Sequence, residues 1–551
     1  MKFPSLITLA VLSAAWSSLG CSSDETVADE SATKRGIQKG TSIRIADGRL
    51  EGAAEAGVRH FFGIPYAKPP LGELRFKAPV KNERWSGARA ATEFGGRCAQ
   101  PTSLNTGPGT DNEDCLYLNV WSPDPAPEAP LPVMFWIHGG GNQNGATSDL
   151  LPGVGKRLFY DGQSLAAKHG VVVVSVNYRL GVLGYLAHPA LGEEGSPSGN
   201  QGLLDQRLAL EWVRDNILAF GGDPNNVTIF GESAGARNVC FQVVSPGSKG
   251  LFRRAISESG DCTGKIATRS EAEAQAAAFV EAVGCGAANV LSCLRNKPAS
   301  ELIIPDQFDG AAPDPVPGGS AYSGGVPRWE FRPVVDGSVV PKMPRDLFAE
   351  ANIGGDAYLM GTNTEEGALA HLTAPKVSSE ADYLLALERR FGTFGSRVAA
   401  AYPLSDFASP NDALIRVSTD SRYSCAVEDF AERAAGAHLN VYAYNFDLDY
   451  AIPGLESLGP AHGAELTFVF GSLAPEQWPA GTQAVSELMQ GYWSRFATSG
   501  DPNGGGAPQW PKFDAARGNR LNLDLDPDVV EQFRAERCAL WNEYYESLFA
   551  P

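Results

Sequence analysis

The sequence predicts an α/β fold with a large, mostly parallel central sheet, flanked by helices and contained in one domain. Residues 171–176 are almost entirely valine, as in strands that are buried on both faces. Apolar side chains recur every four positions within residues 202–219, which predicts a helix that packs on a sheet. A second short apolar strand follows at 227–230. This alternation of strand, helix and strand is typical of a parallel sheet.

Local composition predicts the other elements. Apolar residues make up 43% and charged residues 20% of the 551 positions, which is ordinary for a folded protein. No internal repeat and no clean linker is visible after residue 41, so we expect one domain over residues 41–551. In chain order we predict an antiparallel hairpin within 41–70, strands at 116–121 and 131–137, a long surface loop at 305–328, a mixed helical region after 375 and a late strand at 441–446.

The charge balance is strongly acidic. Lys and Arg number 45 against 64 Asp and Glu, a net charge of −19. Phosphate groups would be repelled, so we expect no nucleic-acid partner. We also expect no metal and no organic cofactor, because the Cys and His spacing offers no convincing zinc site and no phosphate-binding glycine loop is apparent. The sequence does not indicate an oligomeric state.

The N-terminus has the pattern of an export signal. Residues 1–20 combine an early Lys, an apolar stretch and small residues before Cys21, as in signals that are cleaved during export. The Leu-Gly-Cys ending favours acylation of Cys21. Ser18 occupies a position that is usually apolar, and a simple cleaved signal is the alternative. Residues 21–40 suit a polar tether, so we expect a cell-envelope lipoprotein, periplasmic or attached at the outer membrane, or a secreted protein.

A candidate nucleophile lies at residues 231–235, where GESAG has the G-x-S-x-G spacing. The apolar strand 227–230 runs directly into it, and a helical stretch follows from Ala236. Flanking glycines permit a strained strand-to-helix turn that exposes the Ser233 hydroxyl. The alternative is an ordinary serine in a turn, but this context favours a nucleophile.

Residues 138–141, HGGG, directly follow the predicted strand 131–137. Consecutive glycines let backbone N–H groups approach a substrate oxygen. By itself the motif is best interpreted as a flexible turn. Together with Ser233 it matches the loop that donates hydrogen bonds to the oxyanion in esterases and lipases.

The catalytic base is predicted by elimination among seven histidines. In this class of fold the order is serine, acid, histidine, which leaves His371, His438 and His462. His438 lies where a helix is expected to end, and His371 lies too close to the acid candidates. His462 lies in a Gly/Pro-rich loop after the strand 441–446, so we predict that His462 is the base.

An acid is needed to orient the imidazole and to stabilise its charged form. It should follow a strand end between the serine and the histidine. Glu365 and Glu366 follow a short predicted strand at 357–361, and Asp336 lies in a similar position. The pattern alone does not separate these three.

The chain resembles the type-B carboxylesterase/lipase family, which includes the cholinesterases, from about residue 41 to 549. Residues 220–235, FGGDPNNVTIFGESAG, look like the nucleophile signature of the family, and residues 113–121, EDCLYLNVW, look like its second signature. Residues 61–76 and 199–213 match as well. The resemblance implies an α/β-hydrolase fold and a serine hydrolase that cleaves carboxylic esters through an acyl-enzyme intermediate.

The resemblance also implies roles for individual residues. It assigns the acid to Glu366 and supports His462 as the base. Buried polar groups around the histidine are implied too, with structural polarity as the alternative; unpaired carboxylates there would be costly. The remaining implied roles are oxyanion donors at Gly140, Gly141 and Ala234, a supporting network of Glu232, Ser259 and Glu465, and an acyl pocket at Trp329 and Phe331, for which core packing is the alternative.

The family pattern pairs six of the nine cysteines into disulfides. These pairs are Cys98 with Cys115, Cys285 with Cys293, and Cys425 with Cys538. By subtraction, Cys240 and Cys262 are left for a fourth bridge; the alternative is that both are free and buried. An exported chain makes bridges plausible.

Departures from the family narrow the expected substrate. The segment between Cys98 and Cys115 has no aromatic residue where cholinesterases place a Trp for a cation–π contact, so choline esters are not expected. That segment is also polar, unlike the apolar lid of an interfacial lipase, which is the first alternative to an esterase. A non-catalytic adhesion or scaffold member is the second, but such members typically lack the serine.

Overall fold

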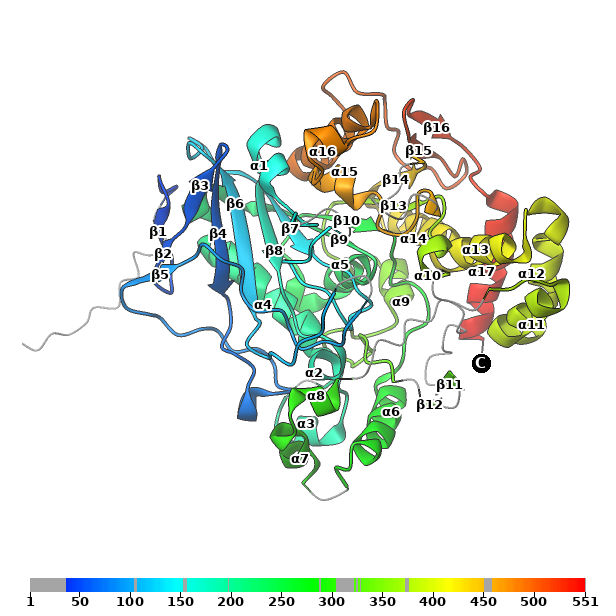
Figure 1. Cartoon of the computed structure of the whole chain (residues 1–551), viewed down its shortest axis with the longest axis horizontal. Coiled ribbons are helices and arrows are strands. Elements are labelled where there is room, and N and C mark those ends of the chain that lie inside the picture. The colour runs from blue at the N-terminus through cyan, green and yellow to red at the C-terminus, as the bar shows by residue number, and fades with distance from the viewer. Residues whose placement is uncertain are drawn as a thin grey trace, which may run out of the picture.

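The computed structural model (Figure 1) describes residues 36–103, 107–151, 156–196, 198–286, 289–303, 322–323, 326–327, 329–371, 376–449 and 458–550. The predicted signal, Cys21, most of the tether and most of the predicted loop 305–328 lie outside the described residues. Within those that are described, none of the helices is both long and apolar enough to cross a membrane.

The centre of the molecule is a sheet of 11 strands. Its inner strands, from β8 to β15, pair in parallel, and its outer strands pair antiparallel. From one edge to the other the strands are β16 (Asp528–Val530), β15 (Arg520–Leu523), β14 (Asn440–Phe446), β13 (Ala357–Asn363), β10 (Arg254–Glu258), β9 (Gly222–Glu232), β7 (Leu131–Ile137), β8 (Val172–Val176), β6 (Tyr117–Pro123), β4 (Val58–Pro65) and β3 (Ala53–Glu55).

The predicted strands are confirmed with small changes of boundary. The strand expected at 227–230 is longer, because β9 begins at Gly222. The N-terminal hairpin consists of β1 (Ser42–Arg44) and β2 (Arg49–Glu51). Strand β2 also pairs with β5 (Ala88–Ala90), and the three strands form a separate small sheet. Two short strands, β11 (Tyr322–Ser323) and β12 (Val326–Pro327), pair inside the segment that the sequence predicted as a loop.

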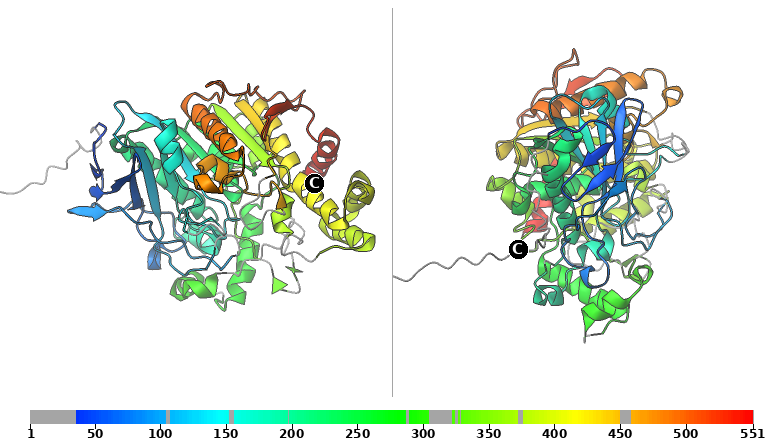
Figure 2. Two further views of the ribbon diagram at one scale, coloured as in Figure 1. Left: turned by 45° about the horizontal axis from the view of Figure 1, so that its top comes forward. Right: turned by 90° about the vertical axis from the view of Figure 1, so that its left-hand side faces the viewer.

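Helices cover both faces of the sheet (Figures 1 and 2). The α-helices are α1 (Gln163–His169), α2 (Gly181–Tyr185), α3 (Pro189–Glu193), α4 (Gln201–Asn216), α5 (Ala234–Val244), α6 (Arg269–Ala282), α7 (Val290–Asn296), α8 (Ala299–Leu302), α9 (Pro344–Ala349), α10 (Gly367–Ala370), α11 (Glu380–Phe391), α12 (Gly395–Ala401), α13 (Pro410–Thr419), α14 (Cys425–Gly436), α15 (Leu466–Phe470), α16 (Thr482–Ser499) and α17 (Ala535–Phe549). Helices α4, α5, α9 and α14 pack on one face, and α1, α15 and α16 pack on the other.

The two faces have separate cores because side chains of a strand alternate between them. In β7, Phe135 points into the core under α4 and α5, whereas Met134 and Trp136 point into the core under α16. A third, smaller core joins α11, α13 and α17 at the end of the molecule that carries the C-terminus (Figure 1). The sheet is therefore buried on both faces, as its valine-rich strands predicted.

The folded part of the chain extends beyond residue 41 towards the N-terminus. The Gln38 N–H donates to the Ala219 carbonyl at 3.1 Å. The buried Arg59 guanidinium donates to the carbonyls of Gln38 and Gly40 at 2.8 and 3.2 Å. The last residues of the predicted tether are thus docked on the domain.

Candidate active site

The glycine loop and the candidate nucleophile meet because β7 and β9 are neighbours in the sheet. Ile137 pairs with Gly231, so both segments leave the sheet at the same level. A Cβ at Gly139 would lie 2.7 Å from the Glu232 carboxylate and 3.2 Å from the Ser233 Cβ. The carboxyl ends of parallel strands are where open α/β sheets form their sites.

Ser233 lies in a strained turn between β9 and α5. Its φ is 57°, an uncommon value for a residue other than glycine. A Cβ at Gly231 would approach the Ile137 carbonyl oxygen to 2.6 Å, and one at Gly235 would approach it to 2.0 Å. Only glycine therefore fits at either position. The turn leaves the Ser233 side chain partly exposed at the edge of the sheet, as the G-x-S-x-G motif predicted.

His462 contacts Glu366. The His462 Nδ1 atom lies 2.6 Å from Glu366 Oε2. The other carboxylate oxygen accepts the Asn363 N–H at 2.8 Å, and the whole Glu366 side chain is buried. The His462 side chain is 13% exposed, so one edge of the ring is open. These contacts fix the ring plane and favour a proton on Nδ1.

The other acid candidates have other partners. Glu365 forms an ion pair with Arg416. Asp336 Oδ1 accepts two backbone N–H groups of its own turn, both at 2.9 Å. Of the three carboxylates that the sequence pattern left open, Glu366 is thus the one in contact with His462.

The other histidine candidates also have structural positions. His371 is buried, and its Nε2 lies 3.0 Å from the Ser418 hydroxyl. His438 follows α14 with a φ of 68°. His138, in the glycine loop, is buried, and this burial lowers its pKa to about 4. It is therefore neutral at physiological pH and holds the loop through a contact of 2.9 Å with the Gly139 carbonyl.

Four buried glutamates lie together beside the histidine, two of them next to its ring, and we call them the acidic cluster: Glu232, Glu258, Glu366 and Glu465. Burial raises the pKa of Glu232 to about 7 and that of Glu258 to about 8. Burial and the charges of the other three also raise the pKa of Glu465 well above its usual value. Carboxyl groups this close together in a buried site cannot all ionise near neutral pH.

The acidic cluster acts on His462 in turn. Glu232 Oε1 lies 3.1 Å from His462 Nε2, without the alignment of a hydrogen bond. Burial alone lowers the pKa of the imidazole. Interactions with the Tyr423 side chain, 4.8 Å away between ring centres, and with Glu232 and Glu366 outweigh burial, so the pKa of His462 lies well above its usual value. The site therefore favours the charged form of the histidine.

Hydrogen bonds join the acidic cluster to the strand ends. The Trp493 indole N–H donates to Glu258 at 2.8 Å. The Ser259 hydroxyl donates to Glu465 at 3.4 Å, and the Asn363 amide donates both to Glu465 and to the Ala461 carbonyl beside the histidine. The sequence placed Glu232, Ser259 and Glu465 in this network but missed Glu258 and Asn363. A polar residue at the last position of each buried strand, β10 and β13, was the available signal.

The glycine loop presents free backbone donors. Gly140 and Gly141 have φ values of 98° and 64°, and within the described residues neither N–H takes part in a hydrogen bond. Ala234 is the first residue of α5, so its N–H is one of the donors that a helix leaves unpaired. These unpaired N–H groups leave Gly140, Gly141 and Ala234 as the candidate oxyanion donors that the resemblance implied.

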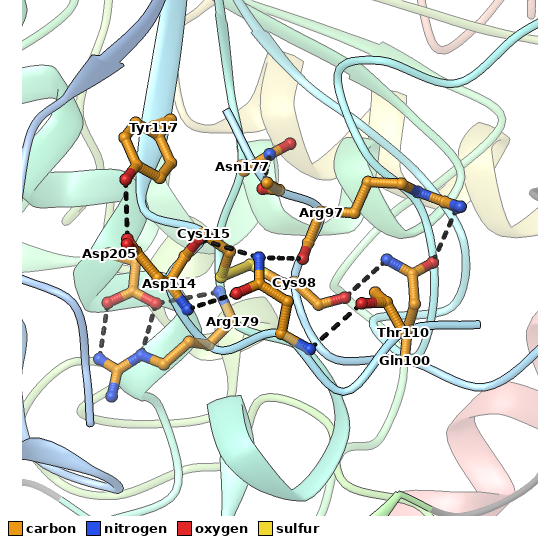
Figure 3. Close-up of a disulfide and its surroundings, with 12 residues drawn as sticks. Arg97, Cys98, Gln100, Thr110, Asp114, Cys115, Tyr117, Asn177, Arg179 and Asp205 are labelled. Carbon is orange, nitrogen blue, oxygen red and sulfur yellow. Dashed lines mark hydrogen bonds and ion pairs between the residues drawn. A yellow bond between two sulfur atoms is a disulfide. The ribbon is translucent and has the colours of Figure 1, made fainter. Parts of the chain in front are cut away.

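The first disulfide loop, whose bridge and Gln100 are drawn in Figure 3, is hydrogen-bonded to the segment that follows the glycine loop. Cys98 and Cys115 are bridged, and Gln100 lies just inside the bridge. Its amide accepts the Gly145 N–H at 2.9 Å and donates to the Gly145 carbonyl at 3.0 Å. It also donates to the Cys98 carbonyl at 2.8 Å. No sequence motif assigned a role to Gln100, because its partner Gly145 lies 45 residues away.

All four disulfides are present. The family pattern implied three of them, and the fourth, Cys240 with Cys262, is formed as well. It joins α5 to the loop after β10. The complete set is Cys98–Cys115, Cys240–Cys262, Cys285–Cys293 and Cys425–Cys538.

The two aromatic residues implied for the acyl pocket pack on the same ring. Phe331 is buried, and its ring centre lies 5.1 Å from that of Phe279, edge to face. Trp329 packs on Phe279 at 5.7 Å. Gln143 follows the glycine loop, and its side-chain amide donates a hydrogen bond to the Phe331 carbonyl at 3.0 Å. Phe331 is thus held next to the site and is also part of the core.

The described part of the chain contains no group of three or more His, Cys, Asp or Glu side chains placed to hold a metal ion. A model described as the carboxylesterase family matches residues 39–541. This match covers the sheet, the nucleophile turn and the histidine loop. The large, mostly parallel sheet with helices on both faces is the α/β-hydrolase fold. The chain therefore belongs to the carboxylesterase family and is a carboxylic ester hydrolase.

Proposed function

We propose that the enzyme cleaves esters through an acyl-enzyme intermediate, with Ser233 as the nucleophile, His462 as the base and Glu366 as the acid that orients it. The observation that carries the proposal is the 2.6 Å contact between His462 Nδ1 and Glu366 Oε2. Because Nδ1 is engaged by Glu366, Nε2 is the ring nitrogen that can accept a proton. Nε2 lies next to Glu232, the residue before Ser233. A nucleophile, a base and a group that orients the base are the parts that acyl transfer requires.

The first half of the reaction forms the acyl-enzyme. The Ser233 oxygen attacks the ester carbonyl carbon as its proton passes to His462 Nε2. The negative oxygen of the tetrahedral intermediate accepts hydrogen bonds from the N–H groups of Gly140, Gly141 and Ala234. The bond to the alcohol oxygen then breaks, and His462 donates its proton to the departing alcohol.

The second half releases the acid. Water gives a proton to His462 Nε2 and attacks the acyl carbon. The intermediate collapses by breaking the bond to the Ser233 oxygen, which regains the proton from His462. Glu366 orients the ring and stabilises the imidazolium in both halves.

The raised pKa of His462 has a consequence for the pH dependence. The base must be neutral to accept a proton, so the charged form that the acidic cluster favours is inactive in the first step. We expect kcat/KM to increase with pH up to a value clearly above the usual histidine pKa of about 6.5,.

The experiment is hydrolysis of p-nitrophenyl esters with acyl chains from C2 to C16 by the chain from residue 22, with Ser233→Ala as the matched variant. We expect activity to peak at short chains and to fall on the order of 10⁶-fold in kcat in the variant, because triad residues act as a unit. Activity that survives in Ser233→Ala would refute the proposal. No activity on any ester by the folded protein would favour a non-catalytic member.

The same series separates an esterase from an interfacial lipase. A lipase requires a mobile apolar lid, and the polar loop closed by Cys98 and Cys115 was the candidate segment. Gln100 and Thr110 pair through both backbone hydrogen bonds, at 2.8 and 3.0 Å, and Gln100 is fastened to Gly145. This fastening supports an esterase. A peak at long acyl chains would support the lipase instead.

We also propose export, with acylation of Cys21. Four disulfides are typical of proteins that fold in an oxidising compartment. Fractionation of cells that express the full chain or Cys21→Ala tests the acylation. The full chain should sediment with membranes and the variant should not; equal release of both would contradict acylation.

A further inference from the structure

A cavity of about 270 Å³ is lined by Asn142, the residue after the oxyanion glycines, and by Arg237, one turn of α5 beyond the proposed nucleophile. One end is formed by Asn142 and Tyr185, which are nearly fully buried. The other end is formed by Tyr544 and Phe549 of α17, which are partly exposed. The cavity thus runs from the glycine loop towards the surface.

Ser233 is not among the lining residues. Segments that line the cavity nevertheless contact the Ser233 turn and the chain that follows the glycine loop. Arg237 lies one helical turn beyond Ser233 on α5, and its N–H donates to the Ser233 carbonyl at 3.0 Å; residues four apart lie on the same side of a helix. A Cβ at Gly260 would lie 2.5 Å from the Ser233 carbonyl oxygen, so the loop that starts there passes over the nucleophile turn. The Gln143 side chain, which follows the glycine loop, donates a hydrogen bond to the carbonyl of Phe331 in the lining. An ester bound at Ser233 therefore has this cavity beside it.

The lining is rich in positive charge although the whole chain carries −19. Acidic side chains also reach the cavity, but they are fewer. The cationic residues are Arg237, Lys265, Arg332, Arg345, Arg390 and Arg422, and the acidic residues are Asp261, Glu271, Glu330 and Asp429.

Three of the four acidic residues already have partners. Glu330 lies 3.3 Å from Arg332. Asp429 forms an ion pair with Arg433, outside the lining. Glu271 caps the start of its own helix by accepting from Thr268. The charges of Glu330 and Asp429 are therefore offset by arginines, whereas Glu271 is engaged by neutral donors at the start of its helix.

The fourth, Asp261, is almost completely buried. Burial raises its pKa, and the nearby Arg237 only partly opposes this. One oxygen accepts the N–H of Thr263 at 2.9 Å and that of Gly264 at 3.3 Å. Asp261 is thus engaged in shaping its own loop.

Arg237 and Lys265 are the cations that the cavity leaves without an ion-pair partner. In the part of the chain that the structure describes, no ion pair within 4.0 Å joins either side chain to a carboxylate, although Arg237 is close enough to Asp261 to oppose the rise in the pKa of that carboxyl. The two come from segments that the Cys240–Cys262 disulfide joins, since Cys240 is on α5 with Arg237 and Cys262 precedes Lys265 by three residues. The bridge therefore links the two segments that bring these cations to the cavity. Partly buried charges of this kind are screened less than charges on an open surface.

We infer that the enzyme prefers esters whose acyl part carries a terminal carboxylate, which Arg237 and Lys265 bind in this cavity. The inference rests on the proposed function, because it requires the ester carbonyl at Ser233. The acyl part is the one that enters the cavity, since Phe331, implied for the acyl pocket, lines it. A carboxylate can accept two hydrogen bonds from an arginine fork, which fixes orientation as well as charge.

The test compares monomethyl adipate with methyl hexanoate, which has the same six-carbon acyl chain without the second carboxylate. Release of acid is followed by titration at about pH 8, where the carboxylate is ionised. The quantity measured is the ratio of the two kcat/KM values. Because both substrates are measured on one preparation, the ratio does not depend on the fraction of folded enzyme.

We expect a ratio above about ten in the wild type, since hydrogen bonds to charged groups correspond to about tenfold or more each. Arg237→Gln and Lys265→Gln should each lower it about tenfold, and about 0.5 M salt should lower it in the wild type by screening. The matched control is Lys168→Gln, an exposed lysine on α1 outside the lining, which should leave the ratio unchanged.

Two failures are distinguishable. If methyl hexanoate is hydrolysed and Ser233→Ala is inactive, but the wild-type ratio is one or less, the esterase proposal stands and this inference is refuted. A ratio that falls equally in Lys168→Gln would also refute it, since the preference would then follow net charge. If neither ester nor any p-nitrophenyl ester is hydrolysed, the proposed function itself has failed.

Discussion

The two sides of the Ser233 turn have opposite charge. On the side of His462, four buried glutamates from the ends of β9, β10 and β13 and from the histidine loop form the acidic cluster. On the side of α5, Arg237 and Lys265 line a cavity without ion-pair partners in the described chain. Both sides start from the same edge of the sheet. The ends of the strands thus bring functional groups together at one edge of the sheet. The charge of each side depends on which residues follow those strand ends.

The charges have different consequences because of what each side faces. Glu232 and Glu366 of the acidic cluster, together with Tyr423, raise the pKa of His462, so they act on the protonation of the proposed base. The two cations of the other side line a space large enough for part of a ligand, so we infer that they act on the choice of substrate. Three predictions separate these roles, and they follow in order of decreasing expected effect.

The largest effect is expected for Glu366→Gln. An amide in place of the carboxylate cannot stabilise the imidazolium and favours the wrong ring tautomer, so kcat should fall about 10³–10⁴-fold. The matched control is Glu365→Gln, whose carboxylate pairs with Arg416 instead and whose loss should change kcat less than about tenfold. Steady-state kinetics with one p-nitrophenyl ester measures both. Equal losses in the two variants would contradict the assignment of Glu366.

An intermediate effect is expected when the Cys240–Cys262 bridge is removed. The variant with both residues changed to Ser should lose about 3 kcal/mol of unfolding free energy, as expected for a loop of this length. Denaturant unfolding measures this loss. The ratio for monomethyl adipate over methyl hexanoate should fall as well, because the bridge fastens the two cationic segments.

The control for that prediction is the Cys285–Cys293 bridge, which closes a loop of only 8 residues outside the cavity lining. Its removal should leave the substrate ratio unchanged. A preserved ratio in the variant without Cys240 and Cys262 would show that the position of the two cations does not depend on the bridge.

The smallest effect is expected for Glu232→Gln. The Glu232 carboxylate favours the charged imidazole and raises the pKa of His462. Its removal should lower that pKa, so the acid limb of the kcat/KM profile should move to lower pH by about one unit. Glu258→Gln, further from the ring, should move it less. An unchanged acid limb in Glu232→Gln would mean that Glu232 is neutral beside the imidazole and would contradict the prediction.

Local sequence predicted the parts of the site that depend on the backbone. Gly231 and Gly235 are required because the Ile137 carbonyl lies within 2.6 Å of any side chain there, and that requirement is visible as a motif. The order of the strands around β7 was not predictable in the same way. The distinction between Glu365 and Glu366 was also open in the pattern, since adjacent residues share the same loop. It took the family resemblance to assign the acid and the structure to show the contact.

The site residues that the sequence did not predict are those whose roles depend on contacts between distant segments. Asn363 joins Glu366, Glu465 and the histidine loop, and Gln100 fastens a glycine 45 residues away. No periodicity in either segment indicates such a partner.

By itself, the sequence determined an α/β fold built on valine-rich strands, a serine in a glycine turn and a loop of oxyanion donors, because these follow from backbone geometry over a few residues. Only the tertiary structure showed the contact between Glu366 and His462, how four glutamates share one buried site, and that Arg237 and Lys265 line one cavity. Burial and neighbouring charge set the pKa values and the selectivity of such groups, and both are properties of packed surroundings that a local stretch of sequence does not contain.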